Sequence, residues 1–64
     1  MSFSKNVKQF REKKGMTQEE LATRVKVAQP MIALYEKGER VPNIFNGVRL
    51  AKALGTTCEE LVAE

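Results

Sequence analysis

The sequence has no histidine, no aspartate and only one cysteine, Cys58, among its 64 residues. These are residue types from which proteins most often build nucleophilic, acid–base and metal sites. A glycine-rich phosphate loop is also missing from the sequence. We therefore expect no enzyme activity, no metal, no cofactor and no small-molecule substrate.

The chain also lacks long apolar runs. None approaches the ~20 residues needed to span a bilayer. Residues 1–14 mix charge throughout, unlike the apolar core of a signal peptide. A single cysteine cannot form an intramolecular disulfide, which fits a reducing compartment. We expect a cytoplasmic protein with no membrane partner.

What is present suits one small globular domain, residues 1–64, with a hydrophobic fraction of 42%. Charge is distributed unevenly along it. Residues 1–40 hold nine Lys/Arg and five Glu, whereas residues 41–64 hold two Lys/Arg and three Glu. A basic front half fits an anionic partner on one face, although ordinary surface solvation explains such charges as well.

Apolar spacing and end signals predict two helices in the first half of the chain. Phe3, Val7 and Phe10 recur every three or four residues, and Gly15 ends this first helix. Residues 17–20, Thr-Gln-Glu-Glu, form a capping-box sequence. This box opens a second helix, whose apolar side is formed by Leu21, Ala22 and Val25.

Three further helices follow. The third runs from about Ala28 to Tyr35, tolerating Pro30 in its first turn and ending before Gly38. Asn43 caps a fourth, expected to turn four side chains inward: Ile44, Val48, Ala51 and Leu54. Residues 57–60 form a second capping box, opening a fifth helix anchored by Leu61. Since no segment alternates with period two, we predict an all-α, compact five-helix bundle.

The short link around Lys26 and Val27 gives the second and third helices a helix-turn-helix layout. Such a turn sets the later helix at a steep angle, so that it can enter a major groove roughly 12 Å wide. The chain resembles the phage repressor and Cro-type family, also called Xre-type regulators, from about Phe3 to Val62. The matching pieces are Gly15-Met16-Thr17-Gln18-Glu19-Glu20-Leu21-Ala22, Val27-Ala28-Gln29, Ile32, Tyr35-Glu36-Lys37-Gly38, Pro42 and Leu50-Ala51-Lys52-Ala53-Leu54-Gly55.

This resemblance implies a lambda-repressor-like fold and binding of double-stranded DNA by a sequence-specific transcriptional regulator, with the helix over residues 28–35 in the major groove. It implies base contacts by four residues of that helix: Gln29, Met31, Ala33 and Leu34. Gln29 matches the leading base-contacting glutamine, whose amide can pair with adenine N6 and N7. Phosphate contacts are implied for Thr17, Gln18, Arg11, Lys37, Arg40 and the Asn43 backbone N–H. The plain alternative is a solvated charge for Lys37 and Arg40, an ordinary helix-start residue for Gln18, and a solvated first-turn residue for Gln29.

The resemblance also implies an ion pair between Arg11 and Glu36, joining the first and third helices. Three positions depart from the family pattern. Lys26 replaces a glycine in the turn, and Ala28 replaces a Ser or Thr cap. Gly47 stands where the family usually has leucine, leaving room for Phe45 or a partner chain to fill.

The apolar residues of the third helix keep a second hypothesis open, a protein-interaction module of the antitoxin-like or adaptor kind with weak or nonspecific DNA binding. An exposed Met/Leu surface there would suit protein contacts. For the regulator, we expect a homodimer formed through the C-terminal helix region, Thr57, Cys58, Leu61 and Val62. Two recognition helices would then lie one DNA turn apart, ~34 Å.

Overall fold

The computed structural model describes residues 3–64, and over these residues the backbone forms helices and no strand. The predicted five helices are confirmed, in this order: α1 (Phe3–Lys13), α2 (Gln18–Val25), α3 (Gln29–Lys37), α4 (Ile44–Leu54) and α5 (Cys58–Leu61). The third helix extends two residues beyond its predicted end, because Gly38 rather than Tyr35 adopts the left-handed closing conformation.

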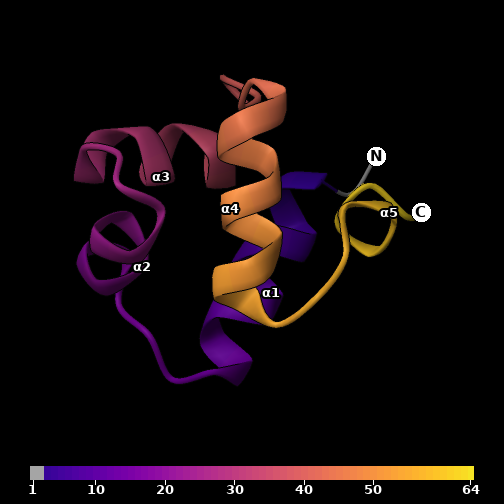
Figure 1. Cartoon of the computed structure of the whole chain (residues 1–64), viewed down its shortest axis with the longest axis horizontal. Helices are drawn as coiled ribbons and strands as arrows, with labels where there is room; N and C mark the ends of the chain where they lie inside the picture. Colours follow the sequence, from indigo (N-terminus) through magenta and orange to yellow (C-terminus); the bar gives the residue numbers. More distant parts are fainter. Residues whose placement is uncertain (1–2) are drawn as a thin grey trace.

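Helix α4 lies at the centre of the arrangement and packs against α1, α2 and α5. Figure 1 shows α2 and α5 on opposite sides of α4, with α1 behind it. Helix α3 packs against α1 and α2. These contacts enclose a core whose largest fully buried side chains are Tyr35, Leu21, Ile32, Leu50, Leu54, Leu61, Val7 and Val25.

The capping box predicted at α2 is complete. The Thr17 hydroxyl accepts from the Glu20 N–H at 3.0 Å, and the Thr17 N–H donates to the Glu20 carboxylate at 2.8 Å. The one predicted at α5 is only half formed. Thr57 accepts from the Glu60 N–H at 3.1 Å, but the Glu60 carboxylate accepts from the Thr56 hydroxyl. The cap by Thr57 is confirmed, and only the reciprocal half of the predicted box is wrong, because the Glu60 carboxylate bonds Thr56 instead.

The inward face predicted for α4 is correct only over its second half. Ala51 and Leu54 are buried together with Leu50, but Ile44 and Val48 are 76% and 41% exposed. Figure 1 shows the first turn of α4 extending past α3. The apolar period is present, but the neighbouring helices leave much of Ile44 and Val48 uncovered.

Lys26 closes α2 in the left-handed conformation, with a φ angle of 67°. Its backbone N–H donates to the Ala22 carbonyl at 2.8 Å, and the next N–H, of Val27, reaches the same carbonyl at 3.1 Å. A residue with a β-carbon pays about 1 kcal/mol in this conformation relative to glycine. The turn between α2 and α3 therefore forms despite its lysine.

Replacement of Lys26 by glycine should raise the free energy of unfolding by about 1 kcal/mol, because glycine relieves this strain. The melting temperature should rise by about 4–8 °C for a domain of this size. Arg24→Gly is the control, because Arg24 lies in α2 itself and should lose about 1 kcal/mol on the same change. Urea and thermal unfolding measure both variants, and an unstabilised Lys26→Gly would contradict the strain.

Candidate nucleic-acid interface

The first turn of α3 stands free of the bundle. Ala28, Gln29 and Pro30 are all exposed, whereas Val27, just before them, packs against the core. Ile32 and Tyr35, on the opposite side of the helix, are fully buried. The same helix is thus anchored by one side and presents its N-terminal turn to solvent, which is the arrangement that entry into a DNA groove requires.

A hydrogen-bonded ion pair fixes the other end of α3. Arg11 Nε and Nη2 donate to the two carboxylate oxygens of Glu36 at 2.6 and 3.2 Å. The side chains are only 12% and 5% exposed, respectively. Arg11 Nη1 also donates to the Met16 carbonyl at 2.7 Å. The predicted pair between the first and third helices is present, and it extends to the loop before α2.

The ion pair shifts the pKa of Arg11. The hydrogen bonds that Arg11 donates to the Glu36 carboxylate raise the pKa of Arg11 above its ordinary value, and partial burial works in the opposite direction. An arginine already keeps its proton at every pH at which proteins fold. The positive charge on α1 is therefore permanent, and the pair does not depend on the protonation of Arg11.

Gln18 joins the same network. Its side-chain Nε2 donates to Glu36 Oε1 at 3.0 Å, so the start of α2 lies beside the last turn of α3. The amide group has a second N–H, which remains available for another acceptor. The bond to Glu36 fixes where that second donor points, so Gln18 is held in place before any ligand arrives.

The sequence-predicted phosphate contacts fall around the C-terminal turn of α3. Arg11 and Gln18 meet there on the carboxylate of Glu36, and Lys37 is the exposed residue that follows Glu36 in the chain. The Thr17 hydroxyl caps α2 as an acceptor, and its own hydrogen remains for donation. The remaining two residues follow α3 in the chain and are exposed: Arg40 and Asn43.

Asn43 is the N-cap of α4, where its Oδ1 accepts from the Asn46 N–H at 2.8 Å. Its Oδ1 is thereby engaged, which leaves the backbone N–H for the predicted phosphate contact and the Nδ2 group as a further donor. Gln29 lies at the opposite end of α3 from Lys37, a rise of about 12 Å along the helix. The predicted base contact of Gln29 and the predicted phosphate contact of Lys37 are therefore at opposite ends of one helix.

The predicted base-contacting residues differ in exposure. Gln29 is exposed, but Met31, Ala33 and Leu34 are each half-buried, and Met31 packs against the core. The expectation of an exposed Met/Leu surface on this helix is wrong. Helix α3 lies against both α1 and α2, so these two helices cover most of its apolar surface.

Two side chains that hydrogen-bond to the backbone of other helices were not predicted from the sequence. Arg49 Nε, on α4, donates to the Val25 carbonyl at 3.0 Å, so a carbonyl at the end of α2 gains a hydrogen-bond partner. Asn6 Nδ2 donates to the Leu61 and Ala63 carbonyls, both at 2.9 Å, and ties α1 to the C-terminal segment. No local motif marks either residue, because each bonds backbone more than 20 positions away.

The part of the chain that the structure describes contains no helix long and apolar enough to cross a membrane. Over residues 3–64, no group of three or more Cys or Glu side chains is placed so that it could hold a metal ion.

Comparisons with known proteins place this geometry in context. The sequence model of the helix-turn-helix family matches residues 7–61. An uncharacterized HTH-type transcriptional regulator of Archaeoglobus fulgidus is 38% identical over 55 residues, covering 86% of this chain and 79% of the relative. The DNA-binding domain of the P22 C2 repressor superposes with a TM-score of 0.92 at 27% identity, covering 97% of this chain and 82% of that one. The restriction-modification controller protein C.AhdI of Aeromonas hydrophila superposes with a TM-score of 0.87 at 30% identity, covering 92% and 89%.

These similarities confirm the family resemblance and the lambda-repressor-like fold predicted from the sequence. The match covers both helices of the helix-turn-helix and the ion-paired residues Arg11 and Glu36.

Substitution of Arg11 by alanine should destabilise the chain by about 3 kcal/mol, because it strands the nearly buried Glu36 carboxylate without its partner. Chemical denaturation measures this loss. The exposed Arg24 offers a matched control, since Arg24→Ala should change stability by less than about 0.5 kcal/mol. Retained thermal stability in Arg11→Ala would contradict a structural role for the pair.

Proposed function

This chain belongs to the helix-turn-helix family of the phage repressor and Cro type, and we propose that it binds double-stranded DNA sequence-specifically and regulates transcription. The observation that carries the proposal is the exposed first turn of α3, led by Gln29, on a helix whose other end is held by the Arg11–Glu36 pair. A rigid helix with a free N-terminal turn can enter the major groove without losing core contacts. Residues 1–64 act in this proposal as one DNA-binding domain.

Sequence discrimination falls mainly to Gln29. A glutamine amide can pair with adenine N6 and N7, a contact worth about 1–3 kcal/mol against a wrong base. The partly exposed atoms of Met31, Ala33 and Leu34 can add contacts with thymine methyl groups. A helix with one polar base-contacting residue depends more than usual on DNA shape for the rest of its preference.

Affinity comes from the phosphate contacts. The proposed contacts with the DNA backbone come from Thr17 and Gln18 at the start of α2, from Lys37 and Arg40 at and after the end of α3, and from the Asn43 N–H. Arg11 adds its permanent charge to this surface, although three of its N–H groups already bond Glu36 and Met16. We therefore assign Arg11 mainly a positioning role, holding Gln18 and α3 through Glu36.

The related regulators and the P22 C2 DNA-binding domain support this function over the protein-interaction alternative. The half-buried Met31 and Leu34 remove the exposed apolar stripe that had favoured an antitoxin-like or adaptor module. The proposed role is binding rather than catalysis, and a DNA partner fits the cytoplasmic location expected from the sequence.

We further propose that the chain acts as a homodimer, formed through the C-terminal region. Thr57, Cys58 and Val62 are exposed there, which suits a contact surface. The prediction that Leu61 is part of that surface is wrong, because Leu61 is 2% exposed and anchors α5 in the core. A dimer would place two recognition helices on successive turns of the same DNA face.

Selection of the full chain on a random duplex pool, at two salt concentrations, tests the function directly. The expected result is a two-fold symmetric consensus, with affinity falling steeply as salt rises because phosphate contacts release counterions. Retention of duplexes that share no consensus would show nonspecific binding and contradict the proposed sequence specificity. Absence of retention at low salt would overturn the proposal.

Single substitutions separate the two kinds of contact on the selected duplex. Gln29→Ala should cost about 1–3 kcal/mol and relax preference at one base pair. Lys37→Ala should weaken all duplexes alike and lower the salt slope by about 1. Lys52→Ala, which removes an exposed charge near the end of α4, is the control and should leave specific affinity nearly unchanged. Equal behaviour of Lys37 and Lys52 variants would contradict the assigned surface.

A further inference from the structure

The exposed first turn of α3 is joined to the bundle through the short turn that precedes it. Lys26 and Val27 both donate their backbone N–H groups to the Ala22 carbonyl, at 2.8 and 3.1 Å, which closes α2 and begins this turn. Ala28, the N-cap of α3, makes no side-chain capping bond. The direction in which the first turn of α3 points is therefore set partly by the backbone at the end of α2.

One side chain from outside the helix-turn-helix bonds this backbone. Arg49, on α4, donates from Nε to the Val25 carbonyl at 3.0 Å, immediately before the left-handed Lys26. Its Nη2 donates to Asn46 Oδ1 at 2.5 Å, so the guanidinium is held in two directions. Within residues 3–64, no other side chain hydrogen-bonds the backbone of residues 25–28.

The charges around Arg49 do not by themselves explain its position. Arg24 and Lys52 line the same hollow as Arg49, and no carboxylate of the described chain forms an ion pair with it. Like charges brought together in this way repel one another. The Val25 carbonyl lies at the negative, C-terminal end of the α2 dipole, and by accepting from the guanidinium it offsets this repulsion.

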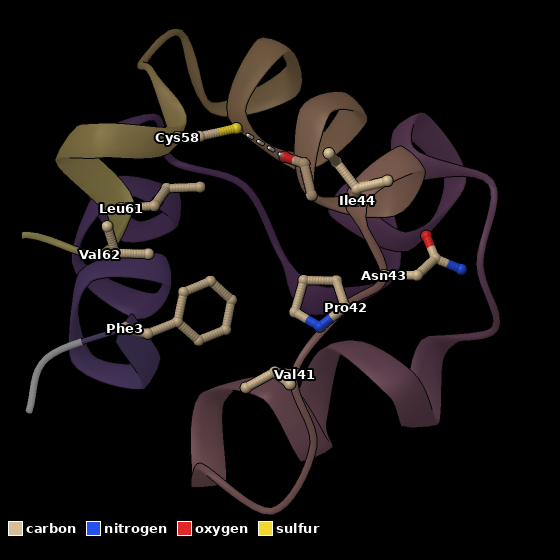
Figure 2. Close-up of a pocket in the computed structure, with 9 residues that line it drawn as sticks. Phe3, Val41, Pro42, Asn43, Ile44, Cys58, Leu61 and Val62 are labelled. Atoms are coloured by element: carbon tan, nitrogen blue, oxygen red, sulfur yellow. Dashed lines mark hydrogen bonds between the residues drawn. The ribbon is translucent and has the colours of Figure 1, made fainter.

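Apolar packing holds α4 firmly only over its second half. The first buried side chain of this helix is Leu50. Nearer its start, an apolar groove of about 290 Å³, lined in part by Gly47, lies between α5 and the link that precedes α4. Figure 2 shows Leu61 and Pro42 on opposite walls of this groove. Arg49 thus joins α4 to the end of α2 at the point where the packed half of α4 begins.

We propose that Arg49 is a positioning residue that holds the end of α2 and thereby the angle at which α3 presents Gln29. This role rests on the proposed DNA binding. Arg11 restrains the start of α2 and the end of α3 through Glu36, and Arg49 restrains the opposite end of α2. Together the two arginines restrain the helix-turn-helix from both sides.

Loss of the Arg49 restraint affects base contacts more than phosphate contacts. A glutamine amide that pairs with adenine N6 and N7 needs two hydrogen bonds aligned at once, so a small rotation of the turn weakens it. The proposed phosphate contacts at the start of α2 and the end of α3 are held by the separate Arg11–Glu36 network. Removal of the Arg49 bonds should therefore lower discrimination between bases and leave affinity for nonspecific duplexes nearly unchanged.

Arg49→Lys tests this role because it keeps the charge. An ammonium group lacks the planar fork with which the guanidinium bonds the Val25 carbonyl and Asn46 together. The ratio of affinities for the selected duplex and for one changed at the Gln29 base pair should fall about three- to tenfold, which is the worth of one net hydrogen bond. A residue with a merely structural role would lower the melting temperature but leave this ratio unchanged, since both duplexes meet the same folded molecules.

Lys52→Ala removes a charge from the same hollow and is the control, so it should keep the ratio of the unmodified chain. An unchanged ratio in Arg49→Lys would overturn the positioning role. An equal loss of affinity for every duplex, shared by Lys52→Ala, would also overturn it, because the hollow would then be a further phosphate contact.

Amide hydrogen exchange of the free protein measures the restraint without DNA. The Lys26 and Val27 amides should exchange about three- to tenfold faster in Arg49→Lys, whereas the amide of the buried Leu50 should exchange as before. Faster exchange of these two amides, in a chain that binds no duplex, would sink the DNA proposal and leave the restraint standing. Unchanged exchange of both would overturn the restraint itself.

Discussion

The two-pronged bond between Arg11 and Glu36 is the contact on which the arrangement of the first three helices depends. Arg11 stands near the end of α1 and Glu36 near the end of α3, and Gln18 at the start of α2 completes the network on the same carboxylate. One nearly buried carboxylate thus fixes three helix ends at once. Because loss of either partner would strand a nearly buried charge, the pair is costly to break from one side.

This constraint explains how so small a core can present a rigid recognition helix. Ile32 and Tyr35 bury one side of α3, and the ion-paired network fixes its C-terminal turn. The turn before it has a residue in a strained left-handed conformation, Lys26, where glycine would adopt that conformation without strain. The neighbouring contacts determine its conformation, which is how local strain persists in folded chains.

Helix α4 carries two tasks along its length. Its second half supplies Leu50, Ala51 and Leu54 to the core, while its first turns leave the bundle and expose Ile44 and Phe45. The link that leads into it passes from the proposed phosphate contacts to the wall of the apolar groove. The proposed phosphate contacts and the apolar groove are thereby adjacent in the chain.

The sequence by itself determined the helices, their caps and the helix-turn-helix, because apolar period, capping residues and glycine stops act within a few positions of the chain. It also indicated the Arg11–Glu36 pair, through a family resemblance rather than through spacing. Only the tertiary structure decided that Met31 and Leu34 are half-buried while Ile44 and Val48 are exposed, because helical period identifies an apolar face but not what covers it. The long-range bonds of Asn6, Gln18 and Arg49, and the groove over Gly47, depend on which helices meet, and that is a property of the packed bundle.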